Sequence, residues 1–397
     1  MEQTLAKSEK KLEKIKENLL FIYLIIFPLG QLLSFRLNLF SYSFPVHIID
    51  FLVVILGFTT LVDIKNYPKF FKPIVNFIWI LAFCYIFSFT IFRSSTLILG
   101  GLYLLRIVFY ALFTITIFNI VKNNQNKKIL LFKSLMVVSL AIAVYGILQY
   151  IFYPDIRGLT ILGWDDHLYR LVSTFIDPGF TSIFLVLGFL ASLLMFLETK
   201  EKKFFVFMAI FMIALTLTYS RAGYLAFFSG TLALLVLKNR LAKLIPLALI
   251  FVGILFLIPN YGSEGVRLGR TRSILTRIVS YQDAFSIFKK SPLLGVGYNN
   301  ICIAKQKYLG QRVNFESHSC SGIESSFLLI LATTGIVGFT IFIYGLGNLL
   351  ILPKNFYGPV FTSSMVAVLT HAFFVNSLFY PWVMGYLGIL FAVSVKE

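Results

Sequence analysis

Charged residues are scarce in this chain of 397 residues, at 13% of the sequence. A typical soluble globular domain carries about 25%. Hydrophobic residues make up 58% and aromatic residues 17%. No water-soluble fold has enough interior to hide that much apolar surface. The apolar residues also come in long unbroken runs, which excludes a soluble enzyme and indicates a membrane protein built from spanning helices.

Acidic residues are scarcer than basic ones, with 17 Asp and Glu against 35 Lys and Arg, so the formal net charge is +18. A nucleic-acid-binding protein would also be basic. Membrane proteins, however, concentrate Lys and Arg in their cytoplasmic loops, and this accounts for the excess. We therefore expect contact with membrane lipid and no nucleic-acid partner.

The features of a cleavable signal peptide are missing, because residues 1–18 form a charged Lys/Glu segment at helical spacing. We expect this segment to be cytoplasmic and the first apolar run to stay as a helix. With about 20 residues needed per span, the sequence predicts an all-α polytopic membrane protein with twelve transmembrane helices. Nine fall within 19–259 and three within 325–397, and residues 260–324 form a long extracytoplasmic loop between spans nine and ten. The predicted spans are 19–35, 46–62, 73–92, 97–121, 129–153, 179–197, 204–219, 222–238, 242–259, 325–351, 359–379 and 382–395.

The basic residues predict the orientation of the chain. With the N-terminus inside, every cytoplasmic segment carries Lys or Arg, as the positive-inside rule requires, and the even number of spans returns the C-terminus to the cytoplasm. The opposite face then has two long loops, 154–178 and 260–324. Its basic residues are mostly arginines, whose planar fork of donors fits phosphate bidentately; a chance bias in codon use is the alternative explanation. These are Arg36, Arg93, Arg157, Arg170, Arg221, Arg267, Arg270, Arg272, Arg277 and Arg312.

Two polar stretches on the outer face lead into apolar spans. One runs from Arg170 to Ser182, and the other is the Ser-Arg-Ala-Gly turn at 220–223. Arg221 is expected at membrane depth or just above it, where a charge is costly unless partnered, so it is a functional candidate. The alternative is an interfacial anchor whose guanidinium group snorkels to water.

The long outer loop contains Arg270, Arg272 and Arg277, followed by a helical pattern of apolar residues. The segment Ser291–Tyr298 carries the Pro and Gly residues that stop a helix and turn the chain. An amphipathic helix here would lie on the membrane surface, with its arginines facing a lipid-borne anion.

Glu324 stands at the outer end of the tenth predicted span, ahead of the spacing Gly335-Ile336-Val337-Gly338. Desolvation next to apolar helices would raise the pKa of this carboxyl group, and nearby arginines would oppose the shift. Such a group is a plausible general base. The alternative is a carboxylate that merely complements the dipole of a helix N-terminus.

Two further pairs are predicted. Arg106, inside the fourth span, could pair across helices with Asp50 of the second span, or could reach the same cavity as the loop arginines. Cys302 and Cys320 both fall in the long outer loop. The compartment that this loop faces is oxidising in many bacteria, so the two cysteines are candidates for a disulfide. The distance between their Cα atoms decides this, and the sequence does not supply it.

In order along the chain, these features resemble those of the O-antigen ligase and O-antigen polymerase superfamily of bacterial surface-polysaccharide assembly. They are the stretch from Arg170 to Ser182, the turn at 220–223, Arg277 upstream of Ser291–Gly297, and Glu324-Ser325 with the Gly335/Gly338 spacing. Each motif alone is weak, but the ordered set over about 170–338 is fairly specific.

The resemblance implies a membrane-embedded, metal-independent, inverting glycosyltransferase of the bacterial inner membrane, with its active site facing the periplasm. It would move a glycan from undecaprenyl diphosphate to an acceptor sugar hydroxyl. By this likeness Arg221 and Arg277 hold the diphosphate, with Arg170 or Arg272 assisting, and no cofactor is needed. The long loop shows no HExxH or paired-Asp motif for a metal.

One departure from the family bears on the reaction. Ligases of this family usually have His-Asn where this chain has Glu324-Ser325, so the role of the base passes to Glu324 or to His318. This favours an O-antigen polymerase, with a ligase acting on a lipid A core as the alternative. A lipid-linked glycan flippase or other transporter is the alternative of another class, but we find no clear internal repeat of the kind common in transporters.

Overall fold

The computed structural model describes residues 2–39, 42–61, 68–92, 97–258, 264–314, 320, 322–351, 353 and 355–395. Within them the α-helices are α1 (Glu2–Ile26), α2 (Ile48–Leu61), α3 (Lys72–Ile91), α4 (Leu97–Val121), α5 (Gln125–Phe152), α6 (Pro178–Thr199), α7 (Lys202–Leu217), α8 (Arg221–Leu237), α9 (Leu244–Leu257), α10 (Arg272–Lys290), α11 (Ile301–Leu309), α12 (Ser326–Ile351), α13 (Gly358–Ala372) and α14 (Pro381–Ser394). The strands are β1 (Ser34–Leu39) and β2 (Tyr42–His47). Short 3-10 turns are η1 (Phe27–Leu33), η3 (Lys69–Phe71), η4 (Arg157–Leu162), η5 (Ser173–Phe175), η6 (Leu241–Lys243) and η7 (Glu264–Val266).

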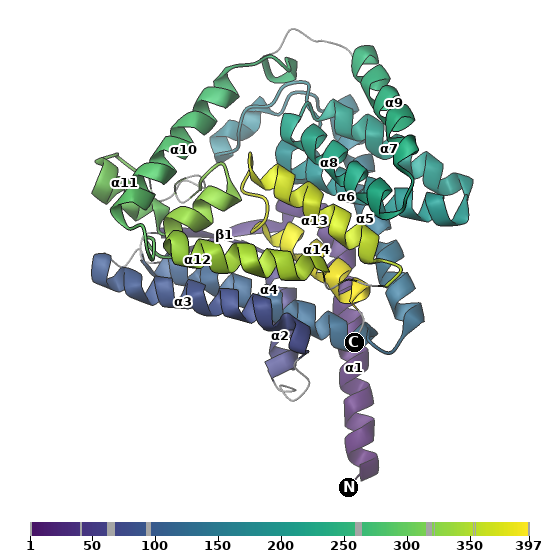
Figure 1. Cartoon of the computed structure of the whole chain (residues 1–397), viewed down its shortest axis with the longest axis horizontal. Coiled ribbons are helices and arrows are strands. Elements are labelled where there is room, and N and C mark those ends of the chain that lie inside the picture. Colours follow the sequence, from purple (N-terminus) through teal and green to yellow (C-terminus); the bar gives the residue numbers. More distant parts are fainter. Residues whose placement is uncertain are drawn as a thin grey trace.

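Every predicted span overlaps one of these helices, and the span predicted at 97–121 has the same bounds as α4. By length and apolar composition, α3, α4, α5, α6, α12 and the segment Lys11–Leu33 can each cross a membrane. The helices α2, α8 and α14 and the segment Leu241–Leu257 are apolar but shorter. The chain is thus a largely helical protein suited to a membrane (Figure 1).

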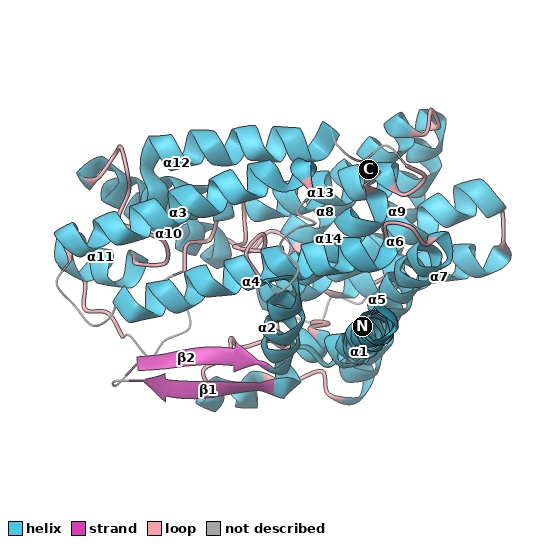
Figure 2. Cartoon of the chain, turned by 90° about the horizontal axis from the view of Figure 1, so that it is seen from below, coloured by secondary structure: helices cyan, strands magenta, loops and turns pink. Residues whose placement is uncertain are grey.

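A β-hairpin is the main addition to the predicted all-α fold. The helix of the first predicted span ends at Ile26, before Pro28 and a Gly30 with φ of 53°. Strands β1 and β2 then pair antiparallel, with Ser34 opposite His47. Apolar and polar residues alternate along β1, which is the strand period, but the pattern adjoins an apolar run and is hidden by it. The hairpin lies outside the helices (Figure 2).

Helix α6 forms the centre of the packing. In its most apolar window, 83% of the residues are buried. Small residues allow the neighbouring helices to approach closely, as is common in membranes. A Cβ added at Gly188 of α6 would lie 2.5 Å from the Cβ of Ser139 in α5, and one at Gly230 of α8 would lie 2.8 Å from the Cβ of Ala367 in α13.

The long loop that follows α9 contains helices α10 and α11. Helix α10 covers the helical pattern expected there and ends at Lys290, before Pro292. It descends along the upper left of the molecule toward α11 (Figure 1). Its Ala284 and Ile287 are buried in one apolar cluster with Leu329 and Ala332 of α12. The apolar face of α10 therefore packs against α12, which fixes the arginines of α10 relative to the bundle.

Candidate active site

The turn between α7 and α8 brings two arginines together. Helix α7 ends at Leu217, and Tyr219 takes a φ of 50°, so the chain reverses before Ser220 caps α8. The carbonyl oxygen of Tyr219 accepts hydrogen bonds from Nη2 of Arg170 at 3.4 Å and from Nη2 of Arg270 at 3.1 Å. One arginine from each of two long loops thus converges on a single backbone atom.

Arg170 is held inside the protein. It is 8% exposed and also donates from Nε to the carbonyl oxygen of Thr218 at 3.0 Å. Burial, followed by repulsion from Arg270, lowers the pKa of Arg170 to about 9, so the group is still cationic at neutral pH. Repulsion between the buried Arg170 and the partly buried Arg270 is reduced by negative charge, of which the Asp177 carboxylate supplies a part. The arginine pair therefore favours binding of an anion.

Arg221 is the first residue of α8. The Ser220 side chain caps this helix by accepting from the backbone N–H of Gly223 at 3.2 Å. Arg221 donates from Nη1 to the carbonyl oxygen of Leu268 at 3.2 Å and from Nη2 to Oγ of Ser273 at 2.7 Å. It thereby ties the electropositive N-terminus of α8, a common location for anions, to the start of α10.

Arg277 of α10 lies beside Glu324. Its Nε donates to the carbonyl oxygen of Phe374 at 3.1 Å and lies 3.6 Å from Oε2 of Glu324. The charge of Arg277 also acts on Arg170 and on Arg221. Four of the residues singled out from the sequence, Arg170, Arg221, Arg277 and Glu324, therefore share one electrostatic neighbourhood.

Glu324 is positioned just ahead of α12, where its backbone N–H donates to Oγ of Ser280 at 3.0 Å. Burial raises the pKa of this carboxyl group, Arg277 opposes the shift, and the carboxylates of Asp177 and Asp165 add to it. Its side chain is 43% exposed, so solvent or a substrate can reach it. The arrangement suits a group that accepts a proton.

A second polar cluster adjoins the arginines and was missed from the sequence. Asp165, His167 and Asp177 each place a ligand atom within 4.8 Å of the others. Asp177 caps α6 by accepting from the N–H of Phe180 at 2.7 Å. His167 is 8% exposed, and its Nε2 has no hydrogen-bond partner among the described residues. In a chain so poor in charge, the run Asp165-Asp166-His167 just ahead of Arg170 was the available signal.

Asp165, His167 and Asp177 are side-chain types that bind metal ions. Arg170 and Arg270 both act on His167, however, and with burial they lower its pKa to about 4 despite Asp165 and Asp166. The positive charge of the two arginines works against a metal ion at this position and favours a ligand that carries negative charge, whereas the carboxylates have the opposite effect.

Backbone hydrogen bonds connect the glycine motifs at 291–297 and 335–338, and we call this connection the joint. The backbone N–H of Gly297 donates to the carbonyl oxygen of Thr333 at 2.8 Å, and the N–H of Ile336 donates to that of Pro292 at 2.9 Å. Gly335 has φ of 64°, and a Cβ there would lie 2.3 Å from the carbonyl carbon of Leu293. The joint fixes the end of α10 to α12, and with it the relation of Arg277 to Glu324.

The remaining loop candidates are placed as follows. Cys302 of α11 and Cys320 are bonded, with their Cα atoms 5.0 Å apart, which clamps the segment ahead of Glu324. Arg272 is the first residue of α10, but its side chain lies outside the described part of the chain. His318 also lies outside the described residues.

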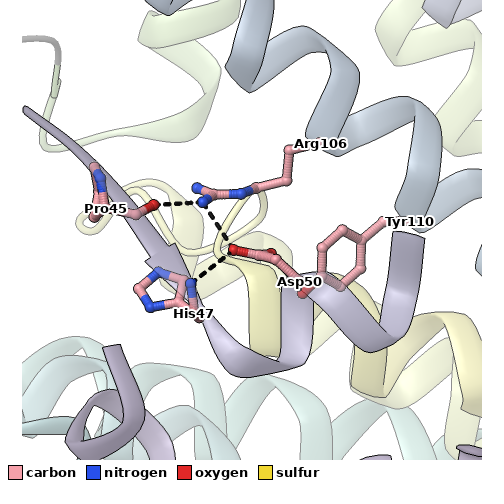
Figure 3. A network of polar contacts seen from close by, with 5 residues as sticks. All are labelled: Pro45, His47, Asp50, Arg106 and Tyr110. Atoms are coloured by element: carbon pink, nitrogen blue, oxygen red, sulfur yellow. Dashed lines mark hydrogen bonds and ion pairs between the residues drawn. The ribbon is translucent and has the colours of Figure 1, made fainter. Parts of the chain in front are cut away.

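Arg106 and Asp50 form a separate network (Figure 3). Nη2 of Arg106 lies 2.8 Å from Oδ2 of Asp50 and donates to the carbonyl oxygen of Pro45 at 2.6 Å. Asp50 also accepts from the N–H of His47 at 3.1 Å and from the Tyr110 hydroxyl at 3.2 Å. Of the two roles considered for Arg106, the contacts correspond to pairing across helices, and the network fastens the hairpin to α2 and α4.

Comparison with known proteins finds a match to part of the chain. Residues 204–343 match the family model described as O-Antigen ligase. The match runs from α7 into α12 and so includes Arg221, Arg270, Arg277 and Glu324. No protein of curated function matches the chain. Over residues 204–343 the chain is therefore similar to the O-antigen ligase family.

Proposed function

We propose that the protein is a glycosyltransferase that moves a glycan from undecaprenyl diphosphate to an acceptor sugar hydroxyl, and that it acts as an O-antigen or polysaccharide polymerase. The observation that carries the proposal is the convergence of Arg170, Arg270, Arg221 and Arg277 beside Glu324. Such a set of fixed cations beside a carboxylate matches a diphosphate leaving group next to a nucleophile that must lose a proton.

The reaction follows from these groups. The acceptor oxygen attacks the anomeric carbon, the bond from that carbon to the phosphate oxygen breaks, and the electron pair leaves with the diphosphate. Fixed guanidinium groups stabilise the negative charge that develops there. Glu324 takes the hydroxyl proton, and in-line attack inverts the anomeric centre. The diphosphate is already an activated leaving group, so the proposed mechanism needs neither metal nor cofactor.

The proposed setting is the bacterial inner membrane, with both termini in the cytoplasm and the arginines at the periplasmic boundary. The lysine-rich segments predicted to be cytoplasmic support this orientation. A polyprenyl donor would keep its chain in the bilayer and present its phosphates at that boundary.

The second candidate is a ligase that joins the glycan to a lipid A core, and the description of the matching family model favours it. Glu324-Ser325 in place of the His-Asn pair usual in ligases favours the polymerase. Both share the donor and differ in the acceptor.

The test is incubation of the purified protein in detergent with a lipid-linked repeat unit, followed by electrophoresis of the glycans. A polymerase produces a ladder from that one substrate, whereas a ligase needs added lipid A core. The variants Arg221→Ala and Glu324→Ala should lose the product while remaining monodisperse. A protein that gives no product with either acceptor but moves the intact lipid-linked glycan across vesicles would refute the proposal in favour of a flippase.

A further inference from the structure

His167 stands between opposing charges. On its own loop it faces Arg170, Asp165 and Asp166; Arg270 approaches from the segment ahead of α10, and Asp177 from the N-terminus of α6. Burial and the two arginines favour the neutral imidazole, while the carboxylates favour the imidazolium. The protonation state of His167 therefore depends on burial first, and then on the balance between the arginine and carboxylate charges.

His167 has a ring nitrogen, Nε2, without a hydrogen-bond partner among the described residues, and the charges of both arginines act on this residue. The residue is 8% exposed. A buried polar atom without a protein partner is costly, and an ordered water or a ligand can satisfy it. The arginine pair that acts on His167 is the pair that converges on the Tyr219 carbonyl oxygen.

We propose that His167 is a further ligand of the donor diphosphate, and that it takes up one proton from solvent as the diphosphate binds. Burial favours the neutral imidazole most strongly, and two phosphate charges placed on Arg170 and Arg270 would oppose it by cancelling the arginine repulsion and adding negative charge beside the ring. The carboxylates of Asp165 and Asp177 remain and stabilise the imidazolium, which then donates from Nε2 to a phosphate oxygen. The inference rests on the proposed function, because it takes the arginines to be the diphosphate site.

The direction of the pH dependence follows from this scheme. Binding that takes up a proton becomes weaker as the pH rises, by up to about tenfold per pH unit for one proton. The affinity depends on pH between two limits. The lower limit is a pH of about 4, the pKa of His167 without ligand, and the upper limit is the higher pKa that His167 has in the complex. The donor should therefore bind more tightly at pH 6 than at pH 8.

The experiment is isothermal titration calorimetry of the detergent-solubilised full chain with a farnesyl diphosphosugar. This probe is a diphosphate diester, so its own phosphates do not titrate near neutral pH. Titrations at pH 6 in two buffers with different ionisation enthalpies give the number of protons taken up. We expect close to one for the wild type.

Two variants separate His167 from its neighbours. In His167→Gln the amide keeps a donor near the position of Nε2 but does not titrate, so proton uptake should vanish and the affinity should become independent of pH. In Asp165→Asn, a change at an exposed position, the imidazolium loses one carboxylate, so uptake at pH 6 should fall. If His167→Gln does not fold, Asp165→Asn still tests whether His167 is the group that takes up the proton. Repeating the His167→Gln comparison in a Glu324→Gln background removes the carboxyl group that could bind a proton instead.

The outcomes are distinct. Uptake that is unchanged in His167→Gln or Asp165→Asn, or the absence of uptake in the wild type, overturns the role of His167 while leaving the diphosphate site intact. A probe that does not bind the wild type overturns the proposed function together with this inference. Binding of Mn²⁺ without diphosphate, measured by electron paramagnetic resonance and lost in His167→Gln, would show a cation site and also overturn it.

Discussion

Arg170 and Arg270 donate to the same carbonyl oxygen, that of Tyr219, at 3.4 and 3.1 Å. Each comes from a different long loop, so the turn ahead of α8 determines the spacing of both guanidinium groups. Lysine at position 270 cannot reproduce the contacts of Arg270 with Tyr219 and with the carbonyl oxygen of Gly265. For Arg270→Lys we expect kcat/KM for the lipid-linked donor to fall about 100-fold, as for loss of one charge-stabilising donor.

The control for this variant is Arg157→Lys. Arg157 pairs with Asp155 in the other long loop, with a side chain 55% exposed, and takes no part in the site. Turnover of this control should equal that of the wild type. Wild-type turnover in Arg270→Lys would remove Arg270 from the diphosphate site.

Arg221 bridges α8 to the start of α10 through Leu268 and Ser273. A lysine side chain ends in a point charge and cannot make both contacts while also facing a phosphate. Arg221→Lys should therefore lose activity almost as fully as Arg221→Ala, with a lower kcat as well as a higher KM. Steady-state kinetics over a range of donor concentrations checks this, and full activity of the lysine variant would mean that only charge matters at this position.

Glu324 should set the acidic limb of the pH profile. A base must be deprotonated, and burial raises the pKa of Glu324 above its usual value, so the rate should decline as pH falls through that raised pKa. Glu324→Gln should reduce turnover about 10²–10⁴-fold and flatten this limb. Glu201→Gln is the control, since Glu201 lies at the start of α7, away from the site. An unchanged limb in Glu324→Gln would assign it to another group.

The joint at Gly335 offers a test of how α10 is positioned. A methyl group there would meet the Leu293 backbone, and φ of 64° is strained for alanine, so Gly335→Ala should lower the melting temperature and the activity together. Gly347→Ala, in the same helix with nothing within 4 Å of the added Cβ, should leave both unchanged or slightly raise stability. Equal melting temperatures for the two variants would contradict a structural role for the joint.

The disulfide between Cys302 and Cys320 closes a loop with a sequence separation of 18 residues. Closing a loop of that size contributes about 3 kcal/mol by restricting the unfolded chain. A reducing agent should therefore lower the melting temperature of the wild type and speed proteolysis of the loop ahead of Glu324. The double variant Cys302→Ser/Cys320→Ser should already show both changes and respond no further to reductant. Identical behaviour with and without reductant would mean that the bond does not form.

The sequence predicted what depends on local composition. Apolar length located α4 to the residue, and the sequence singled out Arg170, Arg221, Arg277 and Glu324, whose charges act on one another in the structure. It did not predict the hairpin, because its alternating pattern of residues directly follows an apolar run. Arg270 was seen as one arginine among several, since its role depends on a carbonyl oxygen of a distant turn.

His167 was missed for a related reason. Its importance comes from burial and from the groups around it, and neither can be read from neighbouring residues. The glycines at 295, 297 and 335 belong to two separate motifs, and no local pattern predicts that the two segments bond to each other.

The ion pair between Asp50 and Arg106 has a consequence for how the chain enters the bilayer. Helix α2 is synthesised before α4, so the carboxylate reaches the membrane while its guanidinium partner is still unmade. A charge at the centre of a bilayer costs about 3 kcal/mol, and one in the first turn of a helix, such as Asp50, costs less but is still stabilised by a partner. We therefore expect α2 to take its final position only once α4 has been translated, so that the two helices settle as a pair.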